Sequence, residues 1–310
     1  MAMRQLSNME ETLVVCKALG SSVRMEIVGI LAQNKEVNLN ELSRQLNISN
    51  GAITQHMKIL KEADIIDIKL TSGKRGVQKI CYLKEHKFMI DILLDVAKEN
   101  MYNVEIPVGG YTKHNIYPTC GISTKTSIIG EVDDPRYFDA PEKSEAGIVW
   151  LGKGYLEYRI PNYLKANHKM TELQISMEIS SEAPGVCQDW PSDIHFYLND
   201  TLLGYWTSPG DFGNVTGIYT PNWWPINWNQ FGLLKLLSIN KEGSFIDGRK
   251  TADIGIDYFN IDYKSDIILR IGVPSGATNV GGVTLFGKGF GNYNQDISIR
   301  AIFEEKESRE

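Results

Sequence analysis

The first hundred residues contain neither proline nor tryptophan. All 11 prolines lie at or after Pro107, all 6 tryptophans lie at or after Trp150, and Tyr82 and Phe88 are the only aromatic residues before position 99. Without proline the first segment can form uninterrupted helices, whereas a segment rich in glycine, proline and aromatic residues is typical of short strands and turns. A single core rarely extends beyond ~250 residues, so we expect two domains, residues 1–100 and 101–310.

The sequence also has no long apolar run and no paired cysteines, and we expect no leader segment. No run approaches the ~20 apolar residues of a membrane-spanning helix. The N-terminal segment is interrupted by charged residues such as Arg4 and Lys17, and no small-residue cleavage site follows. The 4 cysteines are scattered, without a CxxC pair, which favours reduced thiols. We therefore expect a cytoplasmic protein that has no membrane partner and needs no cofactor.

Charge is distributed unevenly along the chain, whose net charge is −6. Residues 1–98 hold 14 Lys/Arg and 11 Asp/Glu, a balance of +3, and residues 99–310 hold 18 and 27, a balance of −9. A mildly basic head on an acidic body is typical of a DNA-reading unit joined to a part that does not touch DNA.

Apolar residues recur with helical spacing through the N-terminal region. Residues 13–19 and 23–31 form two stripes, and Asn40 is expected to open a short third helix. Residues 47–49 form a turn, after which Ser49 or Asn50 caps a fourth helix. Two helices joined by so short a turn are the helix-turn-helix arrangement.

The polar face of the fourth helix is the predicted DNA-reading surface. Glutamine can read adenine, threonine can touch a thymine methyl group, and a capped helix N-terminus favours a phosphate. The alternative is the solvated face of an ordinary amphipathic helix. The candidate DNA-binding residues here are Ser49, Asn50, Ala52, Thr54, Gln55, His56 and Lys58.

A basic hairpin follows and favours DNA binding. Residues 65–70 and 77–83 alternate as strands on either side of a turn, and residues 69–84 hold five Lys/Arg and no acid. Such a wing is positioned for phosphates or the minor groove. Its candidate contacts are Lys69, Lys74, Arg75 and Lys79.

Three segments carry a family resemblance: KALGSSVRMEI (17–27), LSRQLNIS (42–49) and ITQHMKILKEADII (53–66). In order and spacing they are similar to the winged helix-turn-helix regulators of the ArsR family, over about a third of the chain. The resemblance implies a DNA-binding homodimer. Helices near residues 9–19 and 86–98 would pair across its two-fold axis.

The chain departs from the metal-sensing members of that family. Metalloid sensors carry Cys-x-Cys where this chain has Asn38 and Asn40, and soft metals need those thiolates. The zinc-sensing variant uses His and carboxylates of the last helix. This chain offers only an incomplete version of that ligand set, His86, Asp91 and Asp95. We predict no metal site and interpret these residues as an exposed helix face.

Period-two alternation dominates the second half. Each run has one buried and one wet face, as in antiparallel sheets. The runs cover residues 156–160, 172–179, 193–198, 266–273 and 297–301. Many short strands with Gly/Pro turns predict a β-sandwich of the jelly-roll kind. The expected fold class is therefore multidomain α+β: a helical winged helix-turn-helix domain followed by a mainly-β, jelly-roll-like domain. Residues 231–238 fit a helix or a buried strand.

The connection over residues 204–230 is the predicted ligand site. Aromatic faces stack on pyranose rings, and amides and carboxylates bind sugar hydroxyls. The alternative is core, because a long loop must bury something to stay folded. The candidate ligand-binding residues are Trp190, Asp193, Trp206, Asp211, Trp223, Trp224, Asn227, Trp228, Gln230 and Asn292.

Two further features were considered as signs of an enzyme, and neither indicates one. The GxGxG run within residues 281–293 lacks a surrounding βαβ unit, so a ligand-approaching loop or a bulge is expected instead of a dinucleotide site. Four carboxylates could supply a glycosidase pair, but nothing in the sequence brings them together. They are Asp193, Asp211, Asp247 and Asp253.

The sequence thus predicts a dimeric transcriptional regulator, expected to be a repressor. Its head would bind double-stranded DNA at a palindromic operator, and its body a mono- or oligosaccharide. The alternatives are a body that binds a protein partner or a non-sugar ligand, and a fused carbohydrate-active enzyme. An exposed apolar patch would favour the partner, and two carboxylates ~5–10 Å apart in the cleft would favour the enzyme.

Overall fold

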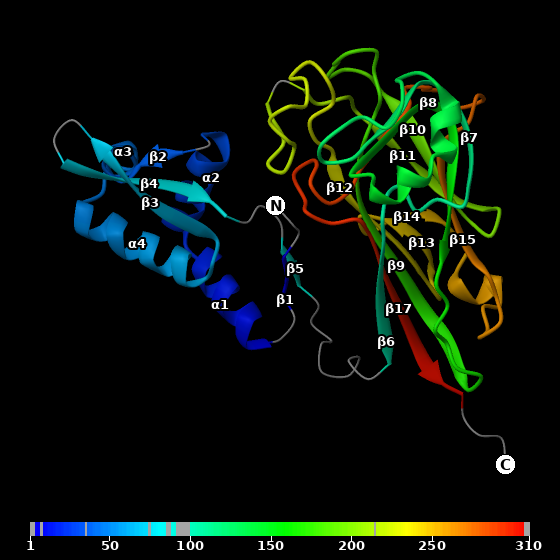
Figure 1. The fold of residues 1–310 in the computed structure, drawn as a ribbon. Coiled ribbons are helices and arrows are strands. Elements are labelled where there is room, and N and C mark those ends of the chain that lie inside the picture. Colours follow the sequence, from blue (N-terminus) through cyan, green and yellow to red (C-terminus); the bar gives the residue numbers. More distant parts are fainter. Residues whose placement is uncertain are drawn as a thin grey trace. The chain divides into compact units, whose positions relative to one another are not determined.

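The structure is a computed structural model that describes residues 4–6, 9–34, 36–73, 76–84, 88–90, 100–213 and 215–306. The chain divides into two compact units, Met1–Lys98 and Glu99–Glu310 (Figure 1). Each unit has its own apolar core.

The N-terminal unit is a winged helix-turn-helix fold, as predicted. A three-stranded antiparallel sheet in the order β2-β4-β3 lies beside the helices. The buried face of α4 carries the apolar residues expected from the sequence, Ile53, Met57 and Leu60. The elements are β1 (Arg4–Leu6), α1 (Met9–Leu19), α2 (Ser22–Gln33), β2 (Val37–Asn38), α3 (Leu39–Gln45), α4 (Asn50–Glu62), β3 (Ile66–Gly73), β4 (Gly76–Leu83) and β5 (Phe88–Ile90).

Two details of this unit differ from the prediction. The helix expected over residues 86–98 is wrong at Phe88–Ile90, which form β5 and pair in parallel with β1. Leu6 of β1 is fully buried and Phe88 packs against the same core, so tertiary packing selects the strand. Residues 85–87 and 91–99 lie outside the described residues. Helix α3 also begins earlier than expected, because Asn38 is its cap and accepts a hydrogen bond from the Asn40 amide at 2.9 Å.

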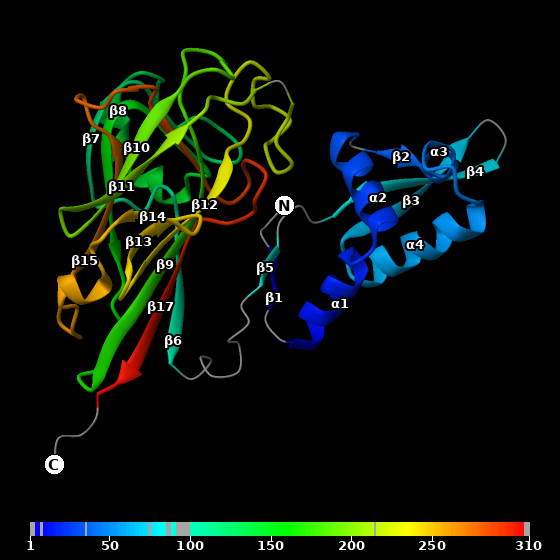
Figure 2. The same ribbon diagram turned by 180° about the vertical axis from the view of Figure 1, so that it is seen from behind.

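Strands make up almost all of the regular secondary structure in the C-terminal unit, as Figure 2 shows from behind. Its helical elements are the short 3-10 turns η1 (Pro135–Asp139), η2 (Pro141–Glu145) and η3 (Ile256–Phe259). Its strands are β6 (Met101–Ile106), β7 (Lys113–Ser123), β8 (Ile148–Ile160), β9 (His168–Ser180), β10 (Ser192–Leu198), β11 (Thr201–Ser208), β12 (Leu233–Asn240), β13 (Gly243–Ile246), β14 (Arg249–Ala252), β15 (Ile267–Val273), β16 (Val283–Phe286) and β17 (Ile297–Glu305).

Two long strands, β8 and β9, each pair with several neighbours and so connect the sheet. Strand β8 pairs with β15 through residues 154–160 and with β16 through residues 148–151. Strand β9 pairs with β16, β12 and β17. The hydrogen-bonded path β11-β10-β15-β8-β16-β9-β12-β13-β14 therefore curls nearly into a barrel. The predicted mainly-β fold is confirmed, and of the two alternatives for residues 231–238 the strand is correct, as β12.

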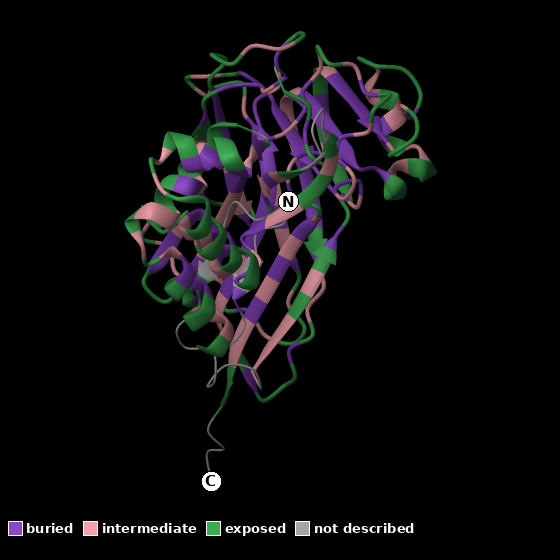
Figure 3. Cartoon of the chain, turned by 90° about the vertical axis from the view of Figure 1, so that its left-hand side faces the viewer, coloured by how far each residue is buried: buried purple, intermediate pink, exposed green. Residues whose placement is uncertain are grey.

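Burial follows the expected alternation along most strands, with exceptions at Glu157 of β8 and along β9. Figure 3 shows buried residues concentrated in the strands and exposed residues in the loops and on outer helix faces. Ser176 and Glu178, predicted on a wet face, are buried. The reason is the glycine-rich segment, whose backbone packs over β9: Glu178 accepts hydrogen bonds from the amides of Asn292 and Tyr293 at 2.8 Å. Gly291, at φ +74, permits this approach, since a Cβ there would lie 2.4 Å from Glu178 Oε1.

Candidate functional site

The turn between α3 and α4 is fixed by Ser43. Its hydroxyl donates to the carbonyl of Ile48 at 2.6 Å, and the Ile48 amide donates to the carbonyl of Ser43 at 3.1 Å. Asn47, at φ 53, takes the left-handed conformation that reverses the chain. These contacts hold α4 at a set angle to α3, as a helix that enters a DNA groove requires.

Helix α4 presents a polar face opposite its buried stripe. Ser49 caps it, accepting from the Ala52 amide at 3.2 Å. Thr54 donates its hydroxyl to the Asn50 carbonyl at 2.7 Å, so its methyl group is the part that remains for a contact. The predicted residues Ser49, Asn50, Thr54, Gln55 and Lys58 are exposed, and Ala52 and His56 are half-buried.

The wing is present as the β3–β4 hairpin. The strands pair as far as Gly73 and Gly76, while Lys74 and Arg75 at the tip lie outside the described residues. Lys69 and Lys79 are both exposed. The Lys69 ammonium lies 2.5 Å from Glu36 Oε1, so its charge is partly neutralised within the unit.

A cavity of about 260 Å³ opens in the C-terminal unit. It lies where β7, β8, β16 and the end of β9 meet the loop between β11 and β12. It is lined by Thr119, Val132, Asp133, Ile148, Trp150, Glu182, Ala183, Pro184, Gly185, Trp224, Trp228, Asn229 and Thr284.

Three indoles form one wall of this tryptophan cavity. The rings of Trp224 and Trp228 are 5.0 Å apart at 87°, and Trp150 lies 5.8 Å from Trp224 and 6.0 Å from Trp228. Such edge-to-face packing holds each ring in place. Gly121 makes room for Trp150 on the neighbouring strand, because a Cβ there would lie 2.1 Å from the indole.

Two carboxylates that were not predicted also line the cavity. Glu182, just after β9, accepts hydrogen bonds from Thr284 Oγ1 at 2.8 Å and Thr119 Oγ1 at 3.3 Å. Asp133 accepts from the Cys120 amide at 2.8 Å. Burial raises the pKa of Glu182 well above its usual range, and the charges of Asp211 and Asp133 add to this.

Some predicted ligand residues reach the cavity and others do not. Trp224 and Trp228 line it. Trp224 is only 6% exposed and is also part of an apolar cluster, as the alternative core interpretation expects. Trp206 is a strand residue of β11 and lies under the Lys235 ammonium, 4.3 Å from its ring centre, instead of in the connecting loop.

Most of the other predicted residues are hydrogen-bonded to the backbone of the loops and do not line the cavity. Trp190 Nε1 donates to the Glu182 carbonyl at 3.1 Å, and Trp223 Nε1 donates to the Lys125 carbonyl at 2.7 Å. Gln230 is buried and its amide donates to the Pro225 carbonyl at 2.8 Å. Asn227 is exposed, and Asn292 Oδ1 accepts from the Ile218 amide at 3.1 Å.

The four carboxylates considered for catalysis do not meet. Asp193 accepts from Thr207 Oγ1 at 2.7 Å. Asp247 pairs with Lys235 and Asp253 pairs with Lys250, each at 2.6 Å. Asp211 alone lies behind the tryptophan cavity: it is fully buried, accepts from the Ala183 amide at 3.1 Å, and its pKa is raised by burial to about 7.

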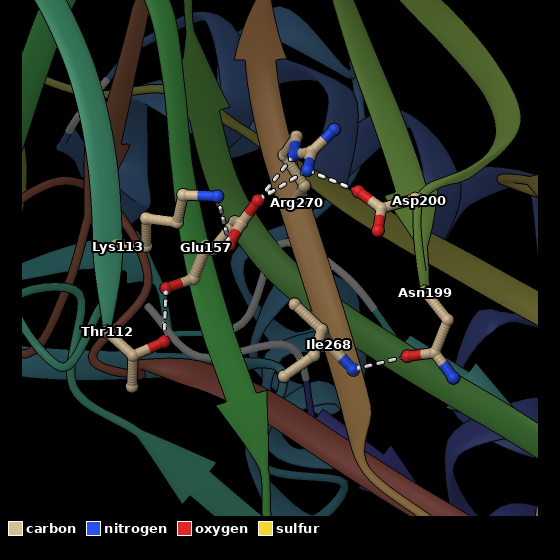
Figure 4. Close-up of polar contacts among 7 residues, drawn as sticks. All are labelled: Thr112, Lys113, Glu157, Asn199, Asp200, Ile268 and Arg270. Carbon is tan, nitrogen blue, oxygen red and sulfur yellow. Dashed lines mark hydrogen bonds and ion pairs between the residues drawn. The ribbon is translucent and has the colours of Figure 1, made fainter.

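A second charged cluster lies on the sheet of β7, β8, β15 and β10 (Figure 4). Arg270 Nε lies 2.8 Å from Glu157 Oε1, and the same guanidinium pairs with Asp200. Lys113 lies 3.9 Å from the other oxygen of Glu157. Each acid of this cluster thus has a basic partner, which marks it as a sheet-stabilising network.

Within the described ranges, no helix has the length and apolar character to cross a membrane. The same residues contain no group of three or more His, Cys, Asp or Glu side chains that could hold a metal ion. His86, Asp91 and Asp95, the incomplete zinc ligand set, lie outside them.

Comparison with known proteins identifies the head. Residues 19–68 match the helix-turn-helix domain family. The uncharacterized HTH-type transcriptional regulator MJ0229 of Methanocaldococcus jannaschii is 31% identical over 75 residues, which are 24% of this chain and 78% of that relative. This chain belongs to the helix-turn-helix transcriptional regulators. It is a DNA-binding regulator whose large C-terminal unit lies beyond the matched segment.

Two solved structures are similar to parts of this chain. HlyU from Vibrio cholerae N16961 is 24% identical with a TM-score of 0.22, over 25% of this chain and 79% of that chain. The carbohydrate-binding module CBM36 in complex with calcium and xylotriose is 9% identical with a TM-score of 0.26, over 66% of this chain and 99% of that chain. At such TM-scores neither likeness bears on function.

Proposed function

We propose that this DNA-binding regulator is a homodimeric repressor whose C-terminal unit senses a sugar in the tryptophan cavity. The observation that carries the proposal is the meeting of three indoles with carboxylate, amide and hydroxyl groups in one cavity of about 260 Å³. Ligand pockets are usually ~300–1,000 Å³, so a cavity just below this range suits a monosaccharide.

The chemistry of the walls supports a sugar. Indole faces at Trp150 and Trp228 offer stacking surface for the apolar side of a pyranose. Acceptors at Glu182, Asp133 and Asn229 are placed for hydroxyl groups. Because the indoles pack on one another and on β8, the site is largely pre-formed.

An apolar stripe on α1 supports the dimer. Met9 is 56% exposed, Leu13 52% and Val14 42%, although each is a large apolar residue near the others on one helix. Such a patch marks an association surface. Two copies joined there would present two α4 helices to half-sites about one helical turn apart, hence a palindromic operator.

One observation favours a second candidate, a fused glycoside hydrolase. Glu182 and Asp133 line the same cavity, and the pKa of Glu182 is raised by burial as in a general acid. Turnover of a panel of nitrophenyl glycosides that is abolished by Glu182→Gln would establish the enzyme. Binding without turnover keeps the sensor.

The sensor is tested by titrating the full chain with a panel of monosaccharides and following tryptophan fluorescence. The Trp228→Ala variant should lose sugar binding at least tenfold. Its matched control is Trp206→Ala, because Trp206 is a half-buried indole outside the cavity lining. Both variants should bind DNA like the parent. Unchanged sugar affinity in Trp228→Ala, or equal losses in both variants, would contradict the proposed site.

A further inference from the structure

Among its described residues, the tryptophan cavity is lined by acidic side chains and by no basic one. Its described lining includes the two acids Glu182 and Asp133, and among these residues there is no Lys, Arg or His. A neutral sugar needs no such excess, since amides and hydroxyls alone satisfy its hydroxyl groups. The lining is therefore complementary to a ligand with a positive charge.

Acceptor lone pairs of Glu182 and Asn229, both in the cavity lining, remain available to a ligand. The Glu182 carboxylate receives one hydroxyl hydrogen bond on each oxygen, from Thr119 and Thr284, although each oxygen can accept two. Asn229 donates its amide to Ser180 Oγ at 2.6 Å, while its Oδ1 is buried and has no partner among the described residues. An ammonium group only donates hydrogen bonds, so it fits a lining with unused acceptor lone pairs.

The charged cluster of Figure 4 shows one way in which this protein compensates acids. There Arg270 bridges Glu157 and Asp200, so the acids are neutralised within the fold. At the cavity, the described partners of Glu182 and Asp133 are hydroxyls and a backbone amide. Glu182 is half-buried, and an acid in such a place without a basic partner is costly to ionise. A bound cation would lower that cost.

The indoles add a second attraction for a cation. Cations are held over the faces of Trp rings within about 6 Å, and this contact strengthens when the site excludes water. Trp150, Trp224 and Trp228 line the cavity together with the two acids. Indoles and acids in one cavity match a ring body that bears an ammonium group.

We infer that the ligand of the tryptophan cavity is an amino sugar with a free ammonium group, held by Glu182 and Asp133 while its ring packs on the indoles. This inference rests on the proposed function, because it takes the cavity to be the sugar site.

Glucosamine, glucose and N-acetylglucosamine test it as matched probes, titrated into the full chain at about pH 6.5 with EDTA present. Glucosamine should bind at least tenfold more tightly than the two neutral sugars. Glu182→Gln should remove most of that preference and leave weak glucose binding in place. Glu172→Gln, an acid of β9 outside the cavity lining, is the control and should keep the preference. If Glu182→Gln is unfolded by circular dichroism, Asp133→Asn takes its place.

The outcomes separate the inference from the proposed function. Equal affinity for all three probes would overturn the inference and leave the sugar sensor standing. Binding of none of the three, nor of any sugar in the panel, would overturn the sensor. Glucose binding that appears with calcium and disappears with EDTA would also overturn the inference, because the acids would then hold a metal ion.

Discussion

Asp211 is the buried acid behind the tryptophan cavity. One carboxylate oxygen accepts the Ala183 amide, and the other is buried without a partner among the described residues. Burial favours the protonated form, which raises the pKa from its ordinary value of 3.8 to about 7. The folded state therefore binds this proton more tightly than the unfolded state does.

The Asp211→Asn variant should remove a pH dependence of stability. The contribution of a carboxyl with a raised pKa is complete below about pH 4 and is lost as the pH rises through about 7. Since one pKa unit corresponds to about 1.4 kcal/mol, the unfolding free energy of the parent should fall relative to that of the variant by roughly 2–4 kcal/mol over this window. Urea unfolding at pH 4, 5.5 and 7.5, followed by tryptophan fluorescence, measures it. A constant difference between parent and variant would contradict it.

Ser43 stabilises the turn between α3 and α4 through its side-chain hydroxyl. Because its hydroxyl holds the Ile48 carbonyl within the turn, Ser43→Ala should lower the unfolding free energy of the N-terminal unit by about 1 kcal/mol. Ser22→Ala, at the exposed start of α2, is the control and should change it by less than about 0.5 kcal/mol. Equal effects in urea unfolding followed by circular dichroism would show that the turn does not depend on this bond.

At the scale of elements, α4 and the wing should contribute differently to DNA binding. We propose that the exposed Gln55 amide of α4 reads a base edge, so Gln55→Ala should relax base preference at one operator position, a change of about 1–3 kcal/mol. We propose that Lys79, on β4, contacts a phosphate, so Lys79→Ala should weaken binding to all sequences and reduce the salt slope by about 1. Fluorescence anisotropy over a salt series with single-base operator variants measures both. A loss of base preference in Lys79→Ala alone would reverse the assigned roles.

The helix-turn-helix was predictable because its signals are local. The stripe at Ile53, Met57 and Leu60 and the cap at Ser49 lie within one helix, and the structure places them as expected. Prediction went wrong at Phe88–Ile90, where the partner strand Arg4–Leu6 lies at the far end of the unit in sequence. A periodic pattern does not contain that long-range pairing.

The tryptophan cavity was only half predictable. The loop residues Trp224 and Trp228 stand out by composition, but Trp150, Glu182 and Thr284 reach the cavity through strand register. Thr284 faces Trp150 on β8 and Ser180 on β9, so three distant segments meet at one point. The one sequence signal for Glu182 was its place directly after a strongly alternating strand.

At the scale of the whole molecule, the chain joins a mildly basic head to an acidic body that holds the cavity. If the body regulates the head, DNA and ligand must affect each other's affinity by the same factor. Titrating glucosamine with and without operator DNA should show Kd values that differ by about 5–150-fold, the range of a ~1–3 kcal/mol coupling. Identical Kd values would mean that the cavity binds its ligand without controlling DNA binding.

The central claim, sequence-specific DNA binding by this regulator, is tested most directly by selection from a random duplex library. The full chain is incubated with the library at moderate salt, and the bound duplexes are sequenced over several rounds. We predict enrichment of an inverted repeat with half-sites about 10 bp apart, and its loss in a selection with Gln55→Ala at the position that Gln55 reads. A library that stays random after repeated rounds, although the protein is folded and binds duplex at low salt, would contradict the account.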